Sequence, residues 1–423
     1  MRAETLFRVI TGTETGARGA DAAAVDAREA RNGLRHVAAL SMSKIADGLL
    51  NPKLVLSWLL TSLGAPAVYA GALVPIREAG ALLPQLFMAG PVAGMARRKW
   101  AWVAGSAGQG LAAAAIALAA LSLQGAAAGL AICALLALLA VARALCSVSY
   151  KDILGDTVGE TRRGAVTGLA GSAAALWVLG FALVLILGRG QSAGLVIGAV
   201  ALAAMLWLGA AAWLARLEET AGQREAGAGG VDFALLRENA TLRRFILVRG
   251  LLVSTALAPP YFVMLGGGEG GQLGRLGALV LASALASLVS SFIWGRAADR
   301  SSRKVLMASG ALGALAMAAA LGASLAGLEQ GPWAIPGALF VLMIAYHGVR
   351  QGRSTYLVDI APQGRRAAWA AVSNTAIGLI LLGAGVAGGA LAALGPRPAL
   401  GFFAVMALAA VPAALRLEEA ETG

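Results

Sequence analysis

GRAADRSSRK, residues Gly295 to Lys304, is the stretch that decides the fold of this chain. It lies between two long apolar runs and combines a glycine, an Asp-Arg pair and an Arg-Lys pair. About two hundred residues earlier, GPVAGMARRK at residues 90–99 keeps the glycine and the Arg-Lys pair at the same spacing. Gly94 stands where the later copy has its aspartate. A basic loop repeated between apolar hairpins predicts a membrane protein built from two related halves.

The composition of the chain agrees with a membrane protein. Of 423 residues, 59% are hydrophobic and 13% are charged, and the mean hydropathy is +0.76. Soluble proteins have about a quarter of their residues charged. A soluble protein of this size could not bury so many apolar runs of about 20 residues, the length that crosses a bilayer. We therefore expect an all-α integral membrane protein.

Hydropathy and turn signals predict twelve transmembrane helices in two pseudo-symmetric six-helix bundles. The expected spans are about residues 37–63, 67–94, 101–123, 126–150, 164–188, 192–215, 243–265, 272–297, 303–326, 333–353, 366–393 and 396–415. The bundles are expected at residues 37–215 and 243–415, joined by a polar linker at 216–242. Residues 1–36 and 416–423 are predicted as an N-terminal segment and a tail. No signal peptide is expected.

The distribution of cations predicts the orientation of the helices. Nineteen Lys and Arg residues lie in the five long loops on one side, and three lie in the opposite loops. The positive-inside rule then places both termini in the cytoplasm. We expect the protein in the inner membrane. The net charge of +12 is explained by this topology, so we do not expect nucleic acid as a partner.

A second repeat supports the division into two halves. The segments DTVGETRRGAVTG and DIAPQGRRAAWAA each close one apolar helix and open the next. Their acidic and basic residues keep the same spacing: Asp156, Arg162 and Arg163 in the first copy, and Asp359, Arg365 and Arg366 in the second. Both repeats share nearly the same offset, so the halves are expected to run parallel.

At these motifs the chain resembles the major facilitator superfamily of secondary transporters, over about residues 37–415. Its loop signature is matched by Gly295, Asp299, Arg300, Arg303 and Lys304. The first copy departs from the signature at Gly94. The resemblance implies two six-helix bundles that rock about a site near the membrane midplane. It does not identify a substrate.

We expect the motif loop to form a latch between the bundles on the cytoplasmic side. Asp299 can accept hydrogen bonds from a helix N-terminus, or can pair with Arg303 or with an arginine of the second repeat. Such contacts exist only when that side is closed, so they bias one of two states. The alternative is that the cations only anchor the topology.

The first helix carries polar residues on one face. Lys44, Asp47 and Asn51 follow the spacing i, i+3, i+7, and Gly48 and Pro52 favour a break in the helix. Charges inside a membrane are costly and face a cavity or a partner. We interpret this face as a substrate or proton pathway. The alternative is a Lys44–Asp47 pair that neutralises itself.

The second helix carries Arg77 and Glu78 near its middle, followed by Gln85. Adjacent helical residues point about 100° apart, so each is expected to meet a group on another helix. A carboxylate that is desolvated but lies near an arginine is balanced between its neutral and charged forms. This balance suits a proton-coupled site.

Weaker candidates for the pathway lie on other helices. They are Arg143, which shares a face with Tyr150, then Tyr346, His347 and Arg350 in AYHGVRQGR, and finally Asn374. Arg143, like Arg249, could instead extend along its helix toward the membrane surface.

Several features predict no site. Cys133 and Cys146 lie in apolar segments without metal-ligand spacing, so neither a disulfide nor a metal is expected. The glycine run at 266–271 lacks the Lys-Ser/Thr of a nucleotide loop and is expected to be an outer loop. Gly385 and Gly389 predict close helix packing. No cofactor is expected.

We therefore expect a monomeric, proton-coupled transporter of a small organic solute, without enzymatic activity. Asp47 and Glu78 are the expected proton carriers, and Arg77 the partner for an anionic group. Export by antiport is preferred slightly over import, on the breadth of the superfamily alone. The alternative is a non-transporting protein of the same fold that assists a membrane complex or handles lipids.

Overall fold

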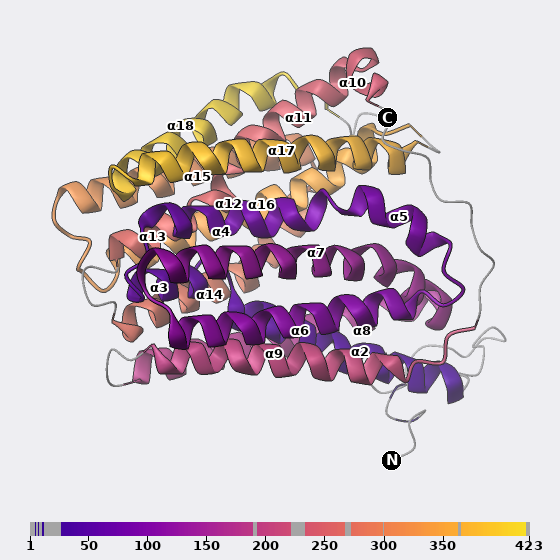
Figure 1. Cartoon of the computed structure of the whole chain (residues 1–423). Coiled ribbons are helices and arrows are strands. Elements are labelled where there is room, and N and C mark those ends of the chain that lie inside the picture. The colour runs from indigo at the N-terminus through magenta and orange to yellow at the C-terminus, as the bar shows by residue number, and fades with distance from the viewer. Residues whose placement is uncertain are drawn as a thin grey trace.

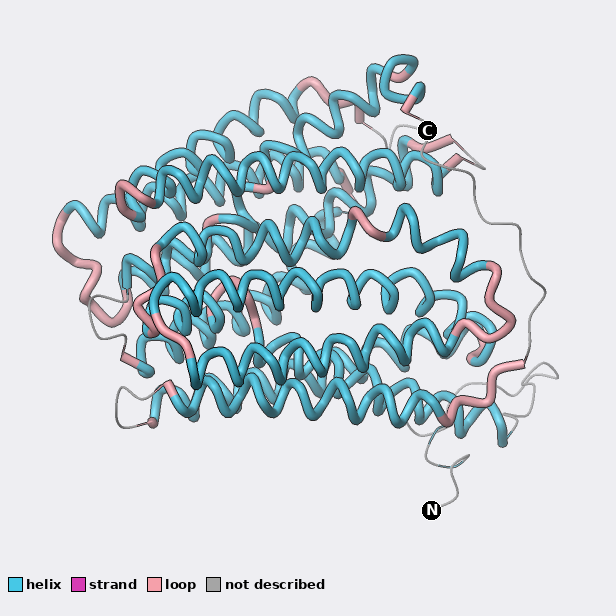
Figure 2. Tube along the Cα trace, viewed as in Figure 1, coloured by secondary structure: helices cyan, strands magenta, loops and turns pink. Residues whose placement is uncertain are grey.

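The computed structural model describes residues 5, 7, 11, 27–188, 193–220, 233–266, 272–298, 300–362 and 365–419. Within these ranges the chain is helical and has no strand (Figure 2). Helices occupy all twelve segments expected to cross the membrane. Nine helices of the described ranges are long and apolar enough to span a bilayer. The other three segments contain helix breaks or several charged residues.

The helices follow the predicted spans closely. The N-terminal half contains α2 (Ala27–Leu50), α3 (Val55–Ser62), α4 (Ala67–Leu82), α5 (Gln85–Ala93), α6 (Lys99–Ser122), α7 (Gly125–Thr157), α8 (Glu160–Leu187) and α9 (Gly194–Ala215). The C-terminal half contains α10 (Ala234–Glu238), α11 (Ala240–Leu252), α12 (Ser254–Leu257), α13 (Pro259–Gly266), α14 (Leu273–Ala298), α15 (Ser302–Leu325), α16 (Ala334–Ile360), α17 (Arg366–Ala392) and α18 (Pro396–Leu415). α2, α7 and α16 extend past their expected ends, because hydropathy marks the apolar part of a helix and not the end of its hydrogen bonding.

The two halves have the same internal arrangement. In Figure 1 most helices of the C-terminal half lie above the N-terminal half, whereas α14 lies lower and packs on α8. In the N-terminal half α6 packs on α7 and α9, and α2 packs on α8 and α9. In the C-terminal half α15 packs on α16 and α18, and α11 packs on α17 and α18. Each contact in one half thus has its counterpart in the other. The prediction of two pseudo-symmetric bundles is confirmed.

Two helices of the N-terminal half break at prolines. Pro52 lies between α2 and α3, and Pro84 lies between α4 and α5. Proline lacks the N–H of the helical ladder, and its ring clashes with the preceding turn. At the first break the Asn51 side chain accepts a hydrogen bond from the Lys53 backbone N–H at 3.0 Å. The predicted break in the first helix is confirmed.

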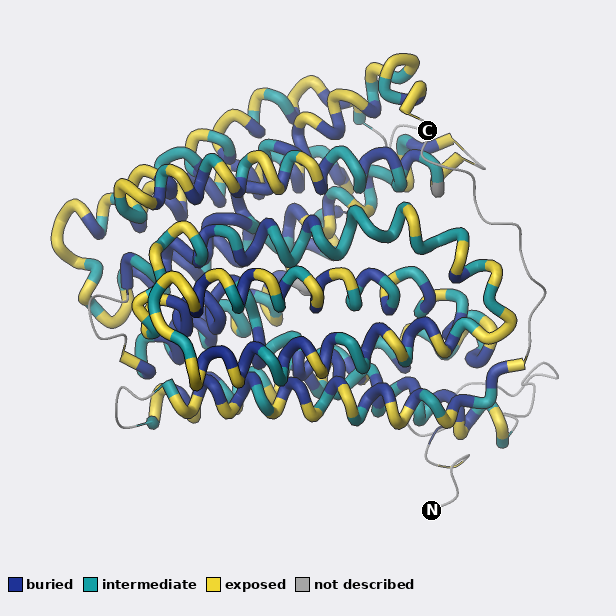
Figure 3. The backbone as a smooth tube through the Cα atoms, in the orientation of Figure 1, coloured by how far each residue is buried: buried dark blue, intermediate teal, exposed yellow. Residues whose placement is uncertain are grey.

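Large apolar side chains cover the outside of the bundles. Leu118 and Leu121 of α6 and Leu130 and Leu138 of α7 are each more than 60% exposed. Figure 3 shows exposed residues recurring along the outward faces of the helices. Soluble monomers rarely expose contiguous apolar patches of more than a few hundred Å². This surface fits the hydrocarbon of a bilayer.

The halves touch each other through α4 with α17 and α8 with α14. A Cβ added at Gly277 of α14 would lie 2.8 Å from the Ile186 backbone nitrogen and 2.9 Å from the Ala182 carbonyl oxygen of α8. A Cβ added at Gly385 of α17 would lie 2.1 Å from Pro75 of α4. Small residues therefore let the helices meet at close range, as the glycine spacing predicts.

The start of α2 and the end of α18 lie at one end of the molecule, here called the termini end; the opposite end is the far end (Figure 1). The close contacts of Gly277 and Gly385 lie toward the far end. α5 turns away from α17 toward the termini end (Figure 1). One further contact, between Leu83 and Gly378, joins α17 to the turn after α4. The halves are thus packed most closely at the far end.

We predict that Gly277→Ala lowers the free energy of unfolding by about 1–3 kcal/mol, because the added methyl meets backbone atoms that cannot yield. Thermal unfolding of the purified protein measures this effect. Gly180→Ala in α8 is the matched control, since nothing lies within 4 Å of a Cβ there. Equal stability of the two variants would contradict the close backbone contact.

Candidate functional site

A cavity of about 620 Å³ lies between the two halves. The N-terminal half lines it with α2, the break after α2, α4, α7 and α8, and the C-terminal half lines it with α14 and α16. The cavity is lined by positions 171–178 of α8 and 280–287 of α14. Both stretches lie closer to the termini end than the contact between Ala182 and Gly277. Close packing of α8 on α14 therefore separates the cavity from the far end.

Asp47 of α2 is held by two arginines inside this cavity. One carboxylate oxygen accepts a hydrogen bond from Arg77 Nη2 of α4 at 2.8 Å. The other oxygen accepts a hydrogen bond from Arg143 Nη1 of α7. The Asp47 side chain is 24% exposed, so the three charges are largely removed from water. One carboxylate thus joins three helices of the N-terminal half.

Lys53 forms a second charged cluster in the break between α2 and α3. Its Nζ lies 3.6 Å from Glu78 Oε1 of α4. The same Nζ lies 3.5 Å from the centroid of the Tyr346 ring of α16, a cation–π contact across the two halves. Sequence reasoning missed Lys53, although it follows Pro52 in the same polar stretch as Asp47.

The wall of the cavity formed by α16 carries cations without carboxylates. Arg350, Arg353 and His347 line it, and the Arg350 guanidinium carbon lies 5.9 Å from the Tyr346 ring centroid. Within the described part of the chain, neither Arg350 nor Arg353 takes part in an ion pair. Sequence reasoning missed Arg353, which lies one turn beyond Arg350.

The structure brings most of the predicted pathway residues together. Those that line the cavity are Lys44, Asp47, Asn51, Arg77, Glu78, Arg143, Tyr346, His347 and Arg350. Lys44 Nζ donates to the Thr167 carbonyl oxygen of α8 at 3.1 Å. Since Asp47 pairs with Arg77 and Arg143 instead, a self-neutralising Lys44–Asp47 pair does not describe the structure.

Gln85 and Asn374 do not line the cavity, which corrects two expectations. Gln85 follows the helix break, and its amide donates to a carbonyl one turn earlier at 2.6 Å. Asn374 accepts a hydrogen bond from Arg249 at 2.9 Å. Tyr150 does not reach the cavity either; its ring lies edge-on to His36, with centroids 5.7 Å apart.

Arg249 is buried between α11 and α17, with an exposed fraction of 6%. Its other hydrogen-bond partner is the Ser373 hydroxyl at 2.8 Å. Both partners are neutral, and the positive charge of Arg353 acts on Arg249. A third arginine thus lies close to the cationic wall of the cavity.

The motif loop of the C-terminal half is held by the residues after α18. Arg303 donates to the Glu419 carboxylate at 2.9 Å, and Lys304 Nζ lies 3.8 Å from it. The Ser301 hydroxyl also bonds to this carboxylate, at 3.0 Å. Asp299, the expected centre of the latch, lies outside the described residues. The described contacts of Arg303 and Lys304 therefore stay within one half.

The N-terminal half has a corresponding arrangement. Glu219 accepts hydrogen bonds from the backbone N–H groups of Arg98 and Lys99 at 2.9 and 3.0 Å, at the start of α6. A helix N-terminus favours an anion at this position. The two tails share the sequence RLEE at 216–219 and 416–419. This repeat was visible in the sequence, and sequence reasoning missed it.

Further ion pairs tie the start of α2 to the same end of the N-terminal half. Glu218 accepts hydrogen bonds from Arg31 and Arg35 at 3.2 and 3.0 Å, and these lower the pKa of Glu218 to about 2. The contact is fully present above the ordinary carboxyl pKa and is lost as pH falls through about 2. Arg162 of the second repeat pairs with Glu29 at 3.0 Å.

The remaining predicted latch residues lie at the termini end. Arg163 donates to the carbonyl groups of Gly155 and Val158 in its own half, and Asp359 lines a separate cavity of about 290 Å³. The others are Gly295, Arg300, Asp156, Arg365 and Arg366. A latch between the halves stays a prediction for a state in which this end is closed.

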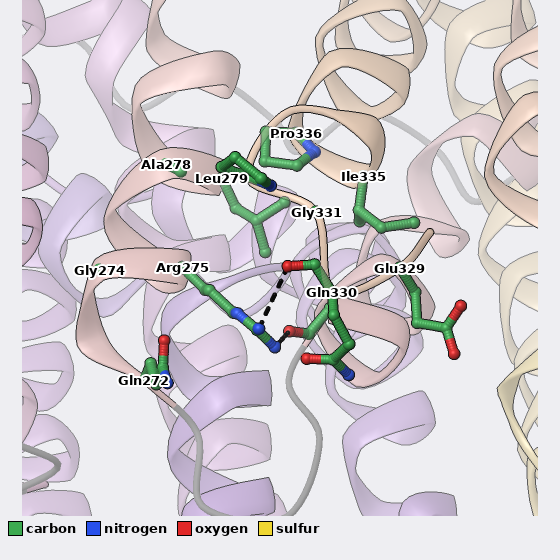
Figure 4. A pocket seen from close by; sticks show the side chains of 12 residues that line it. Gln272, Gly274, Arg275, Ala278, Leu279, Glu329, Gln330, Gly331, Ile335 and Pro336 are labelled. Carbon is green, nitrogen blue, oxygen red and sulfur yellow. Dashed lines mark hydrogen bonds between the residues drawn. The ribbon is translucent and has the colours of Figure 1, made fainter. Parts of the chain in front are cut away.

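A third cavity, of about 280 Å³, lies at the far end of the C-terminal half (Figure 4). Arg275 of α14 crosses it and donates to the carbonyl oxygens of Gly266 at 2.8 Å and Gln330 at 3.3 Å. These bonds connect the end of α13 with the segment before α16. The predicted outer loop begins at Gly266, and residues 267–271 lie outside the described ranges.

The described residues contain no group of three or more His, Cys, Asp or Glu side chains that could hold a metal ion. Cys133 and Cys146 are both buried and free. The cavity between the halves is lined by charged side chains from both of them.

We predict that Asp47→Asn lowers the free energy of unfolding by about 1–3 kcal/mol, because two arginines lose their shared carboxylate. Asp152→Asn is the matched control. Asp152 pairs with Arg98 at 3.2 Å but is 44% exposed, so its loss should cost less than about 1 kcal/mol. Thermal unfolding compares the two variants. A larger loss in Asp152→Asn would contradict the description of Asp47.

The comparisons with known proteins concern the family and the fold. A family model described as Major Facilitator Superfamily matches residues 265–423. No curated protein matches the chain. The nucleoside transporter NupG is similar in structure, with a TM-score of 0.66, 13% identity, and coverage of 91% of this chain and 98% of that one.

Two further solved structures are similar over the same extent. A D-xylose-proton symporter gives a TM-score of 0.66 at 13% identity, covering 92% of this chain and 98% of its own. A POT family transporter in complex with 5-aminolevulinic acid gives 0.66 at 13% identity, covering 90% and 95%. The chain therefore has the fold of major facilitator superfamily transporters, and the resemblance seen in the sequence is confirmed.

Proposed function

We propose that this chain, which has the fold of the major facilitator superfamily, is a proton-coupled secondary transporter of a small organic solute. The single observation that carries the proposal is Asp47, held between Arg77 and Arg143 in a cavity between two halves. Charges inside a membrane protein are costly and mark ion or substrate pathways. Six-helix bundles that are packed most closely at one end suit alternating access.

Asp47 supports a specific coupling step. A solute with an anionic group can replace Asp47 on Arg77 and Arg143, since guanidinium groups bind carboxylate and phosphate strongly. The displaced carboxylate is then left partly desolvated without its counter-ions, which favours its neutral form. Solute binding therefore promotes proton uptake, and by linkage proton uptake promotes solute binding.

This linkage favours symport of solute and proton. In antiport the proton would have to compete with the solute for the same carboxylate, which suits a cationic solute and not a cavity rich in arginine. The expectation of export rested on the breadth of the superfamily alone, and the geometry favours import along a proton gradient. The fold is compatible with symport, because one structural neighbour is named a D-xylose-proton symporter.

Glu78 is the second proposed proton carrier. It lies 3.6 Å from Lys53, which also contacts Tyr346 of the other half. Protonation of Glu78 would free Lys53 from its carboxylate partner and leave its contact with Tyr346. A change of charge in the N-terminal half is thereby transmitted to the C-terminal half.

The orientation is proposed from the loops. The cation-rich loops lie at the termini end, so the positive-inside rule assigns this end to the cytoplasm. The cavity then faces the cytoplasm in the structure, and the far end is the closed outer side.

Proteoliposomes with a pH-sensitive dye in the lumen test the proposal. We expect at least one of gluconate, glutamate, succinate and glycerol 3-phosphate to acidify the lumen when added outside. Asp47→Asn should lower the initial rate of this acidification by at least about tenfold, since the proton acceptor is lost. Asp152→Asn is the control and should keep the rate.

Proton movement at the wild-type rate in both Asp47→Asn and Glu78→Gln would contradict the assignment of the carriers. The alternative function, a non-transporting factor for a membrane complex, has its own signature. Such a protein would give no solute-driven proton movement and would co-purify with a partner complex.

A further inference from the structure

Positive charge dominates the cavity between the halves. Its cations are Lys44, Lys53, Arg77, Arg143, Arg350 and Arg353, and its carboxylates among the described residues are Asp47 and Glu78. This leaves an excess of four positive charges. His347 also lines the cavity and adds no negative charge. An excess of this size, partly removed from water, requires negative charge from elsewhere.

The excess is two positive charges in each half, but both carboxylates belong to the N-terminal half. In the N-terminal half Arg77 and Arg143 share Asp47, and Lys53 lies beside Glu78. In the C-terminal half Arg350 and Arg353 take part in no ion pair within the described ranges. Among the described residues, the cavity's cations without an ion pair are therefore Lys44 of α2 and the two arginines of α16.

Like charges face each other across the cavity. The positive charges of Arg143 and Arg350 both repel Lys44, a lining residue of the cavity on α2. The negative charge of Asp47 opposes this repulsion in part. Arg350 belongs to α16, so this repulsion acts between the two halves. Closing the termini end would bring α16 toward α2 and α8 and would remove water from between them. The repulsion rises as the distance and the effective dielectric constant fall.

We propose that the cavity takes a solute with at least two negative charges, and that this dianion shifts the equilibrium toward closure of the termini end. The inference rests on the proposed transport function and names its substrate class. One anionic group replaces Asp47 on Arg77 and Arg143. The other lies against Arg350 and Arg353, which form no ion pair among the described residues and interact with Glu78 only at longer range. A singly charged solute leaves the α16 cations and Lys44 facing each other.

The size of the cavity limits the solute. A volume of about 620 Å³ is within the usual range for small-molecule sites. Dicarboxylates and phosphate esters both supply two negative charges at this size, and guanidinium groups bind both. Most empty carriers are then open at the termini end, and the small closed fraction allows the carrier to return for another solute.

Distance measurements between two spin labels test the closure directly. The labels are attached at Gly164 of α8 and Ser354 of α16, which are both exposed at the termini end, in a variant without Cys133 and Cys146. Without solute, the long distance between the labels should predominate in the wild type. Arg350→Gln with Arg353→Gln should raise the ratio of closed to open molecules at least about tenfold.

The matched control removes two cations at the same end but outside the cavity. Lys151→Gln with Arg237→Gln changes the net charge equally, and both residues are exposed. The control should keep the wild-type distances. Unchanged distances in the Arg350 and Arg353 variant, or equal closure in the control, would overturn the proposal. This comparison needs no solute, so it tests whether the α16 cations hold the termini end open even if none of the probes fits the cavity.

Probes of different charge test the substrate class. Closure of the wild type by succinate supports a dicarboxylate, and closure by glycerol 3-phosphate supports a phosphate ester. Equal closure by succinamate, which has one negative charge, would overturn the proposal.

If the protein is not a transporter, the vesicle assay and the distance measurement give different results. In that case no solute moves protons in the vesicle assay, while the Arg350 and Arg353 variant still closes. If singly charged gluconate moves protons as fast as succinate, the dianion inference alone is overturned.

Discussion

The ion pairs of Asp47 with Arg77 and Arg143 are the interaction on which the rest of the structure depends. A charge at the centre of a bilayer costs about 2.5–3.5 kcal/mol on insertion scales, so three charged side chains there need each other. Their pairing fixes α2, α4 and α7 around one side of the cavity. The same pairing can be exchanged for a solute, because the guanidinium groups accept any carboxylate or phosphate of suitable shape.

The two halves share their packing but not their charges. Equivalent helices make equivalent contacts, and the RLEE tails at 216–219 and 416–419 each hold a basic loop in place. In contrast, both carboxylates of the cavity belong to the N-terminal half, while Arg350 and Arg353 have none. The proposed function assigns proton coupling to the first half and control of closure to the second. Pseudo-symmetric packing thus permits rocking, and the cavity cations that lack a carboxylate partner make the rocking depend on the solute.

Much of this could be predicted from the sequence, because hydropathy and loop repeats report directly on membrane spans and on duplication. The spacing of Lys44 and Asp47 also placed both side chains on the face that lines the cavity. Their partners could not be predicted, since the contacts of Asp47 with Arg143 and of Lys53 with Tyr346 depend on how separate helices pack. Gln85 was assigned to the cavity wrongly because the helix was assumed to continue through the break before it.

Infrared difference spectroscopy of Asp47 tests the central claim most directly. The claim is that an anionic solute takes the place of the Asp47 carboxylate, which then binds a proton. The measurement uses a solute that moves protons in vesicles, added to the purified protein. The account predicts that the carbonyl stretch of a protonated carboxylic acid appears on binding and is absent in Asp47→Asn. The same band in Asp47→Asn, or no protonated carboxyl in the wild type, would contradict it.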